Sequence, residues 1–542
     1  MPSTGPARPR LLLTVLVVCT LPPPYPLPPA SALLQPMASR PPAVLIVGSG
    51  ISGLAAAHKL HARGFQNVRV LEATGRTGGR IRSRRYGKGF IEIGAQWIHG
   101  PSPGNPVFRL ASEYSLLGPD ALTKENQEVD VGGHPPPFSV SYGSSGKKIS
   151  PEVVGNVMEM YSSWLEQTRN FTHTGCDPKA SVGGFIQREI ALRAKEWDSG
   201  AAGTTLALLS GLLKLECCIS GTHSMDDVAL CPFGEYTVLP GLDCTFPGGY
   251  ESLVNQIKST LPDDSILLNK AVKTVHWNGS YQNGSYQTHN SRSFPVMVEC
   301  EDGETFVADH VIVTVPLGFL KERTASFLSP KLPPNKVKAI QNMGFGTNNK
   351  VFLEFKEPFW EPDCEIIQLV WEGESPLKES PKNLKQDWVK KFAGFVVLQP
   401  PELVGHVLCG FIAGEESEYM ETLTDEDILS AMTAVLRQFT GNPQLPPPVR
   451  MLRTRWRSEP YTRGSYSYVA VGSSGEDVDI LARPLPLEED TSKPLQVLFA
   501  GEATHRNFYS TTHGALLSGW READRLTRHY PELVRPLNRS KL

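Results

Sequence analysis

A glycine-rich segment near the start of the chain has the spacing that binding a dinucleotide requires. Residues 48–53 read GSGISG and follow the apolar run 43–47, AVLIV. Gly48 permits a tight turn, Gly50 lets the backbone approach a pyrophosphate, and Gly53 lets the following helix pack against the strand. An apolar run of this kind is typical of a fully buried strand in a parallel sheet.

The elements that must position this segment follow it in order. Residues 51–63 are rich in alanine and leucine and predict a helix, with Ser52 in its first turn and Gly64 as its stop. The N-terminus of that helix directs unpaired N–H groups at the phosphates. Residues 67–71 predict a second strand, and Glu72 at its end can accept hydrogen bonds from ribose hydroxyls. Strand, helix, strand and acid in this register disfavour the alternative of a glycine-rich surface loop.

Two further segments extend the predicted nucleotide site. Residues 72–80 read EATGRTGGR, so the backbone can approach the ligand again and Arg76 and Arg80 can meet phosphate. A basic surface turn is the alternative, but this turn leaves the strand that ends at the ribose. Near the far end of the chain, residues 498–502 (LFAGE) are a second apolar strand that breaks at a glycine. A chain whose first and last strands bind one dinucleotide wraps around it, as flavin enzymes do.

These segments resemble elements of the FAD-dependent amine oxidase family, which includes monoamine and polyamine oxidases. Residues 76–80 resemble its RxGGR element, and Gly501-Glu502 resembles its second flavin motif, which places Glu502 near the ribityl and pyrophosphate groups. The resemblance extends over roughly residues 43–526. Within the family, the chain most resembles the acetylpolyamine oxidases and the related spermine oxidases. The other matching segments are 94–100 (GAQWIHG), 246–250 (FPGGY), 266–275, 311–316, 344–351, 454–456 and 464–467.

The resemblance implies an FAD site and no metal site. Monoamine oxidases attach their flavin through a cysteine just before a tyrosine of the aromatic wall, where this chain has Ser465 before Tyr466. A hydroxyl does not form that thioether, so we expect non-covalent FAD. A second wall tyrosine of monoamine oxidases is replaced by Thr511 and Thr512, which suits a long, flexible amine. The implied FAD contacts are Gly48, Gly50, Ser52, Gly53, Glu72, Arg80, Gln96, Trp97, Val272, Trp456, Glu502, Thr511 and Thr512.

The resemblance assigns catalysis to Lys350 and His99. Lys350 is expected to hold a water against flavin N5 and to assist oxidation by O2. His99 is expected to bind or deprotonate a substrate ammonium, because imidazole titrates near neutral pH. An exposed strand lysine and a hydrogen-bonded core histidine are the alternatives. Asn348 shares a strand face with Lys350, and Asn349 replaces it if the strand is bulged. The implied substrate contacts are His99, Trp97, Glu216, Asn348, Tyr466 and Thr511.

Glu216 is a candidate carboxylate for binding a cationic amine. It lies in the apolar segment 212–219, where a carboxylate needs a partner such as a substrate ammonium. Its Glu-Cys-Cys context also resembles the spermine-oxidase position that carries a substrate carboxylate. A solvated helix charge is the alternative. Asp226 and Asp227 are expected to cap a helix or to lie at the rim of the site.

The predicted activity is the oxidation of acetylated spermine and spermidine at a secondary amine. A neutral amine transfers a hydride from its α-carbon to flavin N5, water releases an aldehyde and a shorter amine, and O2 yields H2O2. Spermine oxidase is the alternative, since the preference for an acetamide or an ammonium at the far end is not readable. A flavin-fold scaffold without catalysis is a third interpretation, opposed by Lys350 and His99. An amino-acid oxidase needs an arginine for the substrate carboxylate, and no matched tunnel position has one.

The composition is that of a large globular enzyme. With 542 residues, 40% hydrophobic residues and a net charge of −3, the chain can bury a large core and shows no sign of nucleic-acid binding. We expect a monomer with an α/β fold, in which a Rossmann-type FAD-binding domain is interleaved with an α+β substrate domain. The nine cysteines show no metal spacing, the adjacent Cys217 and Cys218 are expected to be structural thiols, and a disulfide framework is not expected. The expected FAD-binding segments are 41–110, 246–325 and 480–530, the substrate segments 111–245 and 326–479, with helices at 181–193 and 206–217 and one strand at 266–275.

The two ends of the chain resemble targeting signals for different compartments. Residues 1–36 combine early arginines with the apolar run 11–21, as a secretory signal does, and that run is too short to span a membrane. The chain ends in Ser540-Lys541-Leu542, a peroxisomal address read by an import receptor. We expect a peroxisomal enzyme without a membrane span, with residues 1–40 as an extension, Met37 as a candidate start and 531–542 as a tail. Secretion is the alternative.

Overall fold

The first strand of the chain lies at the centre of a five-stranded parallel sheet. The strand order is β21–β12–β1–β2–β6. The central strand β1 (Ala43–Val47) pairs with β2 (Asn67–Leu71) and β12 (His310–Val313), and β6 (Ile266–Leu267) and β21 (Val497–Phe499) form the edges. All residues of β1 are buried, so the predicted buried strand at 43–47 and the strand at 67–71 are confirmed.

The computed structural model describes residues 41–129, 138–171, 176–282, 293–378, 383–486 and 494–534. These residues belong to one compact unit that begins at Pro41. The predicted N-terminal extension with Met37, and the terminal Ser540-Lys541-Leu542, lie outside the described residues.

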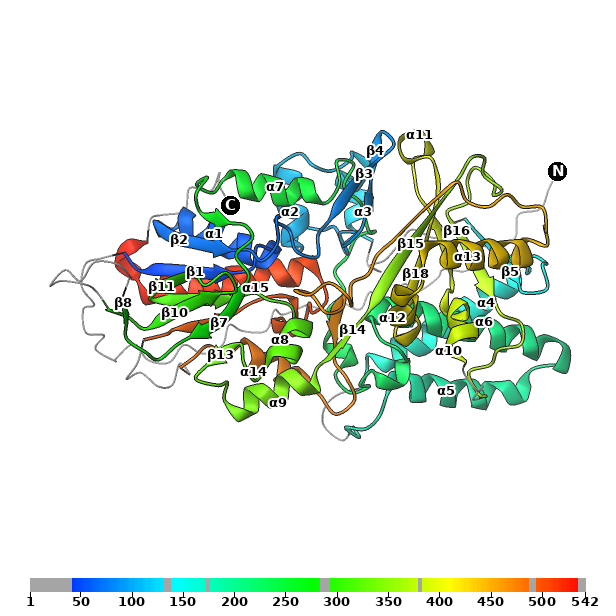
Figure 1. Cartoon of the computed structure of the whole chain (residues 1–542). Helices are drawn as coiled ribbons and strands as arrows, with labels where there is room; N and C mark the ends of the chain where they lie inside the picture. Colours follow the sequence, from blue (N-terminus) through cyan, green and yellow to red (C-terminus); the bar gives the residue numbers. More distant parts are fainter. Residues whose placement is uncertain are drawn as a thin grey trace, which may run out of the picture. The chain divides into compact units, whose positions relative to one another are not determined.

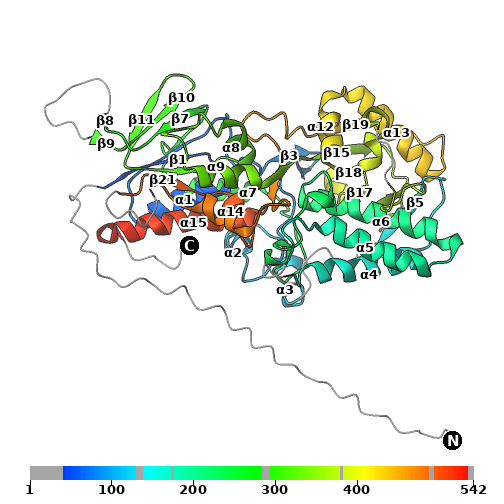
Figure 2. The same cartoon turned by 90° about the horizontal axis from the view of Figure 1, so that it is seen from below.

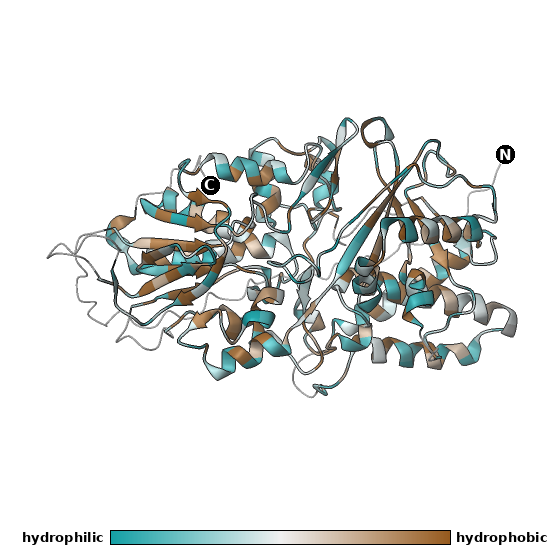
Figure 3. Cartoon of the chain, in the orientation of Figure 1, coloured by the Kyte–Doolittle hydropathy of each residue, from teal (hydrophilic) through white to brown (hydrophobic). Residues whose placement is uncertain are grey.

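The two faces of the parallel sheet have different covers (Figure 1). On one face, Val44 and Ile46 lie in a hydrophobic cluster with residues of α1 (Ile51–Ala62), α7 (Glu251–Ser259) and α15 (Thr512–His529). The neighbouring residues of β1 lie in a second cluster, together with residues of another sheet and of α8 (Leu317–Arg323), α9 (Pro334–Asn342) and α14 (Gly475–Ala482). Figure 3 shows how hydrophobic residues recur along these strands. The alternation follows from the strand geometry, since successive side chains point to opposite faces.

The sheet on the second face corrects one prediction. Residues 266–275, expected as one strand, form two strands in different sheets, because the chain turns at Asn269, which has a positive φ of 57°. The strand β6 pairs with β2, whereas β7 (Val272–His276) begins a four-stranded sheet. The other strands of that sheet are β10 (Val296–Cys300), β11 (Thr305–Ala308) and β13 (Leu328–Ser329).

A six-stranded mixed sheet carries the segment that contains Lys350. Its order is β19–β15–β18–β17–β16–β5, and β15 (Asn348–Phe355) pairs without a register shift with β18 (His406–Ala413). A two-stranded ribbon of β14 (Gly344–Gly346) and β20 (Tyr466–Tyr468) precedes it. The remaining strands are β5 (Ser139–Gly143), β16 (Ile366–Val370), β17 (Gly394–Val397) and β19 (Arg450–Arg453).

Three long helices, α4, α5 and α6, pack together beside this sheet (Figure 2). They span Pro151–Thr168, Val182–Arg193 and Ser199–Ser220, which confirms the two predicted helices and lengthens the second. The last turn of α6 ends at Gly221 in the left-handed conformation. Part of α6, Gly200–Ser220, is long and apolar enough to cross a membrane by length and composition alone, a test that core helices of soluble proteins also pass.

The other helices and strands join these layers. Their bounds are α2 (Pro106–Glu113), α8 (Leu317–Arg323), α9 (Pro334–Asn342), α12 (Glu415–Thr422), α13 (Asp425–Thr440), α14 (Gly475–Ala482), β3 (Ser83–Tyr86), β4 (Gly89–Glu92), β8 (Tyr281–Gln282) and β9 (Ser293–Phe294), with the short helices α3 (Lys124–Gln127), α10 (Leu384–Asp387) and α11 (Pro401–Val404).

Cys217 and Cys218 are free, buried thiols, as expected, and two other cysteines form a disulfide. Cys176 and Cys231 form a disulfide across 55 residues of sequence, with their Cα atoms 5.9 Å apart. The loop that it closes contains both α5 and α6. Among the described residues, six other cysteines are free thiols: Cys217, Cys218, Cys300, Cys364 and Cys409 are buried and Cys244 is partly exposed.

Candidate functional site

The glycine segment after β1 has the geometry that a dinucleotide needs. Gly48 has a positive φ of 102°, and a Cβ at Gly53 would lie only 2.0 Å from the carbonyl oxygen of Gly48. Both positions therefore exclude other residues. A Cβ at Gly50 would meet nothing within 4 Å, so its backbone borders open space at the N-terminus of α1. This opening fits a pyrophosphate on the N–H groups of the helix.

The acidic residue after β2 lies beside the glycine turn. Oε2 of Glu72 accepts hydrogen bonds from N and Oγ of Ser49, at 2.9 and 2.7 Å, and Oε1 accepts from N and Oγ1 of Thr74. The backbone of Lys270 donates to the carbonyl oxygen of Glu72 at 2.8 Å, which brings the start of β7 and Val272 to this end of the site. The carboxylate is thereby fixed in the place where a ribose is expected.

The second glycine motif is joined to residues far away in sequence. Nη1 of Arg80 donates at 2.9 Å both to Oε1 of Glu502 and to the carbonyl oxygen of Ser465. Oε2 of Glu502 accepts from Ser467 Oγ and, at 2.6 Å, from the backbone N–H of Ser510. Arg80 and Glu502 also line a small cavity at the carboxyl ends of β12 and β21, the edge where ligands of parallel sheets bind. No sequence signal pointed to Ser467 or Ser510.

Lys350 is buried and makes three hydrogen bonds. Its Nζ donates to the carbonyl oxygens of Glu92 and Gly94, at 2.7 and 2.8 Å, and to Oε1 of Gln96 at 2.8 Å. The ammonium also lies 5.5 Å from the ring centre of Phe411. Burial lowers the pKa of Lys350. All three donors of the ammonium are used, so the interpretation as an exposed strand lysine is wrong.

The segment after Gln96 carries an imidazole at the rim of the site. Nδ1 of His99 lies 2.6 Å from Oδ2 of Asp243, and half of the His99 side chain is exposed, against 4% of Asp243. Asp243 also accepts from the backbone N–H of Gly100 at 3.1 Å. The ring of Trp97 stacks on Phe411, with centroids 6.0 Å apart. The alternative of a core histidine is therefore wrong. The sequence analysis did not identify Asp243 as the partner of His99, because the two residues are far apart in sequence.

Asn348 faces Tyr466 and the end of α6. Its Nδ2 donates to the hydroxyl of Tyr466 at 2.6 Å and to the carbonyl oxygen of Cys218 at 3.1 Å, and its Oδ1 is buried with no hydrogen-bond partner among the described residues. Such an acceptor invites a donor from a ligand. By contrast, Asn349 is buried and bonded through both ends to Ser417, Glu421, Thr454 and Trp456. The strand is not bulged, and Asn348 shares its face with Lys350.

Glu216 is buried on the last turns of α6, two residues before Cys218. Burial raises its pKa to about 7. Among the described residues, no hydrogen bond or ion pair joins its carboxylate to a partner. The solvated helix charge is therefore excluded. Asp227 accepts from the backbone of Ser224 and caps a short helix, as expected.

Five other residues named from the sequence make contacts that hold the framework. Ser52 Oγ lies 3.1 Å from Ser518 Oγ, which joins α1 to α15, and Thr511 Oγ1 caps α15 by accepting from Gly514 N at 2.9 Å. Thr512 Oγ1 lies 2.5 Å from the hydroxyl of Tyr250. Trp456 is buried and its backbone donates to Asn349. Ser465 Oγ bonds both N and O of Asn348, at 2.9 and 2.8 Å.

The predicted residues thus form two connected groups. Gly50 and Glu72 lie at the phosphate and ribose end, and Arg80 links Glu502 to Ser465, whose hydroxyl bonds Asn348, two residues before Lys350. Residues 51–527 match the family model for the flavin-containing amine oxidoreductases. The chain belongs to this family. Its members carry the flavin for which the open glycine turn and the Arg80–Glu502 pair are suited.

The chain is similar to curated members of the family over nearly its whole length. It is 57% identical to the human peroxisomal N(1)-acetyl-spermine/spermidine oxidase, over 91% of this chain and 97% of that protein. It is 58% identical to the Bos taurus protein of the same name, over 90% of this chain and 95% of that protein. Identity to polyamine oxidase 1 of Oryza sativa subsp. japonica is 33%, over 91% and 98%.

Proposed function

We propose that the chain is an FAD-dependent oxidase of acetylspermine and acetylspermidine that acts at a secondary amine. The products are a shorter polyamine, an acetamidoaldehyde and H2O2. The observation that carries this proposal is the similarity, at 57% and 58% identity over nine tenths of the chain, to two proteins named for this activity. We also propose a peroxisomal location, supported by the names of these relatives and by the terminal Ser-Lys-Leu of the sequence.

The FAD-binding residues follow from the fit of the site. Gly48, Gly50 and Gly53 at the N-terminus of α1 would hold the phosphates, Glu72 would hold a ribose, and Arg80 and Glu502 would hold the ribityl and pyrophosphate region. FAD supplies the acceptor for hydride and passes the electrons to O2. The expected FAD-binding segments 41–110, 246–325 and 480–530 contain all five strands of the parallel sheet. Non-covalent binding is supported by Ser465, whose hydroxyl is already bonded to the backbone of Asn348.

Lys350 positions a water for the reaction with O2. Its three donors are directed to Glu92, Gly94 and Gln96, and only the last acceptor belongs to a side chain. A water therefore binds Lys350 by replacing Oε1 of Gln96, which rotates away. The two backbone carbonyls keep the ammonium in place during this exchange.

His99 and Asn348 receive the amine that is oxidised. With Nδ1 bonded to Asp243, the other ring nitrogen of His99 has a lone pair that can take a proton from a substrate ammonium. The neutral amine that results has the lone pair that hydride transfer requires. Oδ1 of Asn348 can accept an N–H of the substrate, and Tyr466 and Trp97 provide aromatic walls for its methylene chain.

Glu216 binds a second, charged nitrogen of the substrate. A buried carboxylate without a partner is costly, and a substrate ammonium supplies the missing charge. Acetylspermine retains ammonium groups beyond the reacting nitrogen, whereas an aryl amine offers none.

The test is H2O2 formation by the purified protein with acetylspermine, spermine and an aromatic amine, with products identified by mass spectrometry. We expect fastest turnover of acetylspermine, with an acetamidoaldehyde among the products. Faster turnover of spermine instead assigns the chain to the spermine oxidases. Bound flavin without turnover of any of the three amines contradicts the proposed function.

A further inference from the structure

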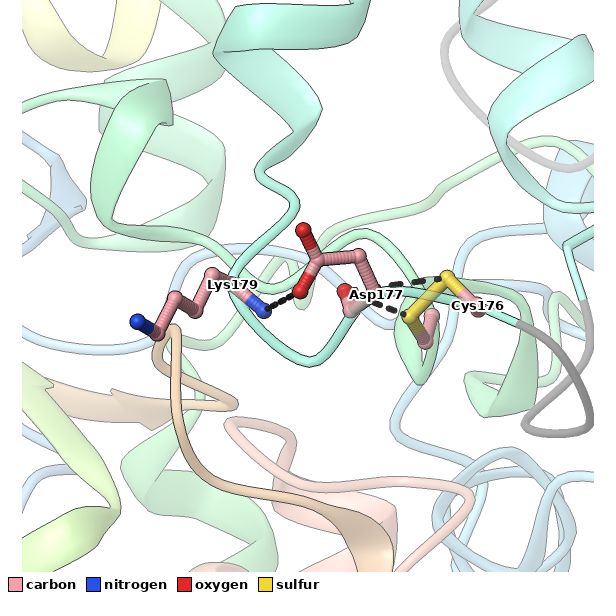
Figure 4. Close-up of a disulfide and its surroundings, with 4 residues drawn as sticks. Cys176, Asp177 and Lys179 are labelled. Atoms are coloured by element: carbon pink, nitrogen blue, oxygen red, sulfur yellow. Dashed lines mark hydrogen bonds between the residues drawn. A yellow bond between two sulfur atoms is a disulfide. The ribbon is translucent and has the colours of Figure 1, made fainter.

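Figure 4 shows the disulfide between Cys176 and Cys231. Cys231 belongs to a segment whose contacts lead to the site. Beside the disulfide, the carbonyl oxygen of Asp177 lies 3.3 Å from Sγ of Cys231. Leu230 N donates to the carbonyl oxygen of Ala180 at 2.9 Å. The disulfide therefore attaches residues 228–237, called here the splint, to the residues that precede α5.

The other side of the splint contacts two loops of the site. Ala229 N donates to the carbonyl oxygen of Val469, just after the strand of Tyr466, at 3.0 Å. Glu235 binds Arg506 through both carboxylate oxygens, at 2.7 and 2.8 Å. Thr237 N donates to the carbonyl oxygen of Asn507 at 3.0 Å. Arg506 and Asn507 belong to the loop that follows Glu502.

The chain continues from the splint to the partner of His99. Asp243 follows the splint in sequence, and the next residue, Cys244, pairs with Ile98 next to His99. Leu239 fits against Gly100, where a Cβ would come within 2.5 Å of it. A change in the mobility of the splint should therefore alter the position of Asp243 relative to His99.

We propose that Cys176 and Cys231 are an oxidation site that is closed by the peroxide formed in turnover, and that closure orders the splint and tightens amine binding. The proposal rests on the proposed function, because that activity supplies the oxidant. Similar proteins are named peroxisomal, and disulfides inside cells are usually transient, catalytic or redox-sensing. A pair of thiols beside a source of H2O2 fits a sensor of that product.

The chemistry needs nothing else. The partly exposed Cys176 attacks H2O2 as the thiolate, the O–O bond breaks, and water leaves with a sulfenic acid remaining on sulfur. Cys231 then attacks that sulfur, the S–S bond forms, and the second oxygen leaves as water. Two thiols are oxidised, one peroxide is reduced, and the two thiol protons end in the two waters.

The other thiols are protected from the same reaction. Burial raises the pKa of Cys218, Cys244 and Cys409 to about 12 and that of Cys300 to about 11. Only the thiolate is nucleophilic, so these cysteines react slowly with peroxide. These four thiols therefore compete poorly with Cys176 and Cys231 for peroxide.

The test begins with the full-length holoenzyme, reduced and freed of reductant under nitrogen. It is then given air and acetylspermine, with and without catalase, quenched with N-ethylmaleimide, and analysed by peptide mass spectrometry, while H2O2 is measured in a separate aliquot. We expect Cys176 and Cys231 to lose their alkylation together, catalase to prevent this loss, and Cys300 to remain alkylated. A pair that stays reduced while peroxide accumulates, or that closes equally with catalase, overturns the inference alone. Absence of peroxide overturns the proposed function and the inference with it.

A second measurement tests the link to the site. Closing the disulfide is expected to slow hydrogen exchange of the splint and to lower the KM for acetylspermine about fivefold. The variant C176S is expected to keep the KM of the reduced enzyme whatever its exposure to peroxide, and C300S is the matched control that keeps the response. Equal exchange and equal KM in reduced and oxidised wild-type enzyme overturn the proposed effect on binding, and this comparison needs no variant to fold.

Discussion

Arg80 and Glu502 lie 422 residues apart in sequence and form an ion pair of 2.9 Å. The Glu502 side chain is almost fully buried, and the pair is the point where the first and last segments of the nucleotide site meet. Ser467 and Ser510 use the remaining carboxylate oxygen. Among the described residues, Arg80 is the only charged side chain bonded to Glu502, so we expect the proposed flavin site to depend on this pair.

Replacing Glu502 by glutamine leaves the charge of Arg80 without a counter-charge. We expect the free energy of unfolding to fall by about 3 kcal/mol, as when one partner of a buried pair is removed. The ratio of flavin to protein absorbance should fall as well. The control is K124A, which breaks the exposed pair of Lys124 and Glu128 and should change neither quantity. Wild-type flavin content and melting temperature in E502Q contradict this account of the site.

Lys350→Met tests the assignment of Lys350 to the reaction with O2. The change removes the donors that hold Gln96 and the water, so reoxidation of the flavin by O2 should slow about 10²-fold. Anaerobic reduction by the amine should change by only a few-fold. Stopped-flow absorbance measures the two half-reactions separately.

Lys336→Met is the matched control for Lys350→Met. Lys336 is also buried, and its Nζ donates to the backbone carbonyls of Ile480, Leu481 and Arg483. Both variants should lose stability, but only K350M should lose reactivity with O2. Equal oxidation rates in the two variants remove Lys350 from the mechanism.

Glu216 predicts a pH dependence of stability. Because burial raises its pKa from 4.5 to about 7, the folded state holds the proton more tightly than the unfolded state. The free energy of unfolding should therefore fall as the pH rises from about 4.5 to about 7, by at most about 3 kcal/mol. E216Q lacks this loss. Its free energy of unfolding in urea, relative to that of the wild type, should therefore increase across that pH range.

A polyamine should reverse the effect of Glu216. Above about pH 7 the carboxylate is ionised, so acetylspermine should stabilise the wild type more than E216Q and bind it with a lower KM. Glu92, whose pKa burial also raises to about 7, is present in both proteins and cancels from the comparison. A constant difference between the two proteins at every pH, with equal ligand stabilisation, shows that Glu216 does not face the substrate.

The flavin should leave the protein on denaturation. Ser465 cannot form the thioether of monoamine oxidases, and its hydroxyl is bonded to Asn348. Acid precipitation should place all the flavin in the supernatant, measured by its absorbance. Yellow colour that stays with the washed pellet shows a covalent link at another residue.

Features that depend on local backbone geometry were predictable from the sequence. Gly48 and Gly53 are required by a positive φ and a close approach, and the strands 43–47 and 67–71 follow from their apolar patterns. The shared face of Asn348 and Lys350 follows from the period of a strand. Such features need only neighbouring residues, so a single sequence contains them.

Features that depend on distant packing were not predictable. Asp243 lies 144 residues from His99, and its neighbours contain no pattern that pairs them. The disulfide joins cysteines 55 residues apart, a spacing that favours no pairing. The single strand expected at 266–275 was wrong because one left-handed residue, Asn269, sends the chain into a second sheet.

The central claim is that the flavin accepts hydride from an acetylated polyamine. The most direct measurement is anaerobic mixing of the holoenzyme with acetylspermine or spermine, followed by the visible absorbance of the flavin. The account predicts rapid bleaching by acetylspermine and bleaching about tenfold slower by spermine, as the proposed substrate preference implies. Faster bleaching by spermine, or none by either amine, contradicts it.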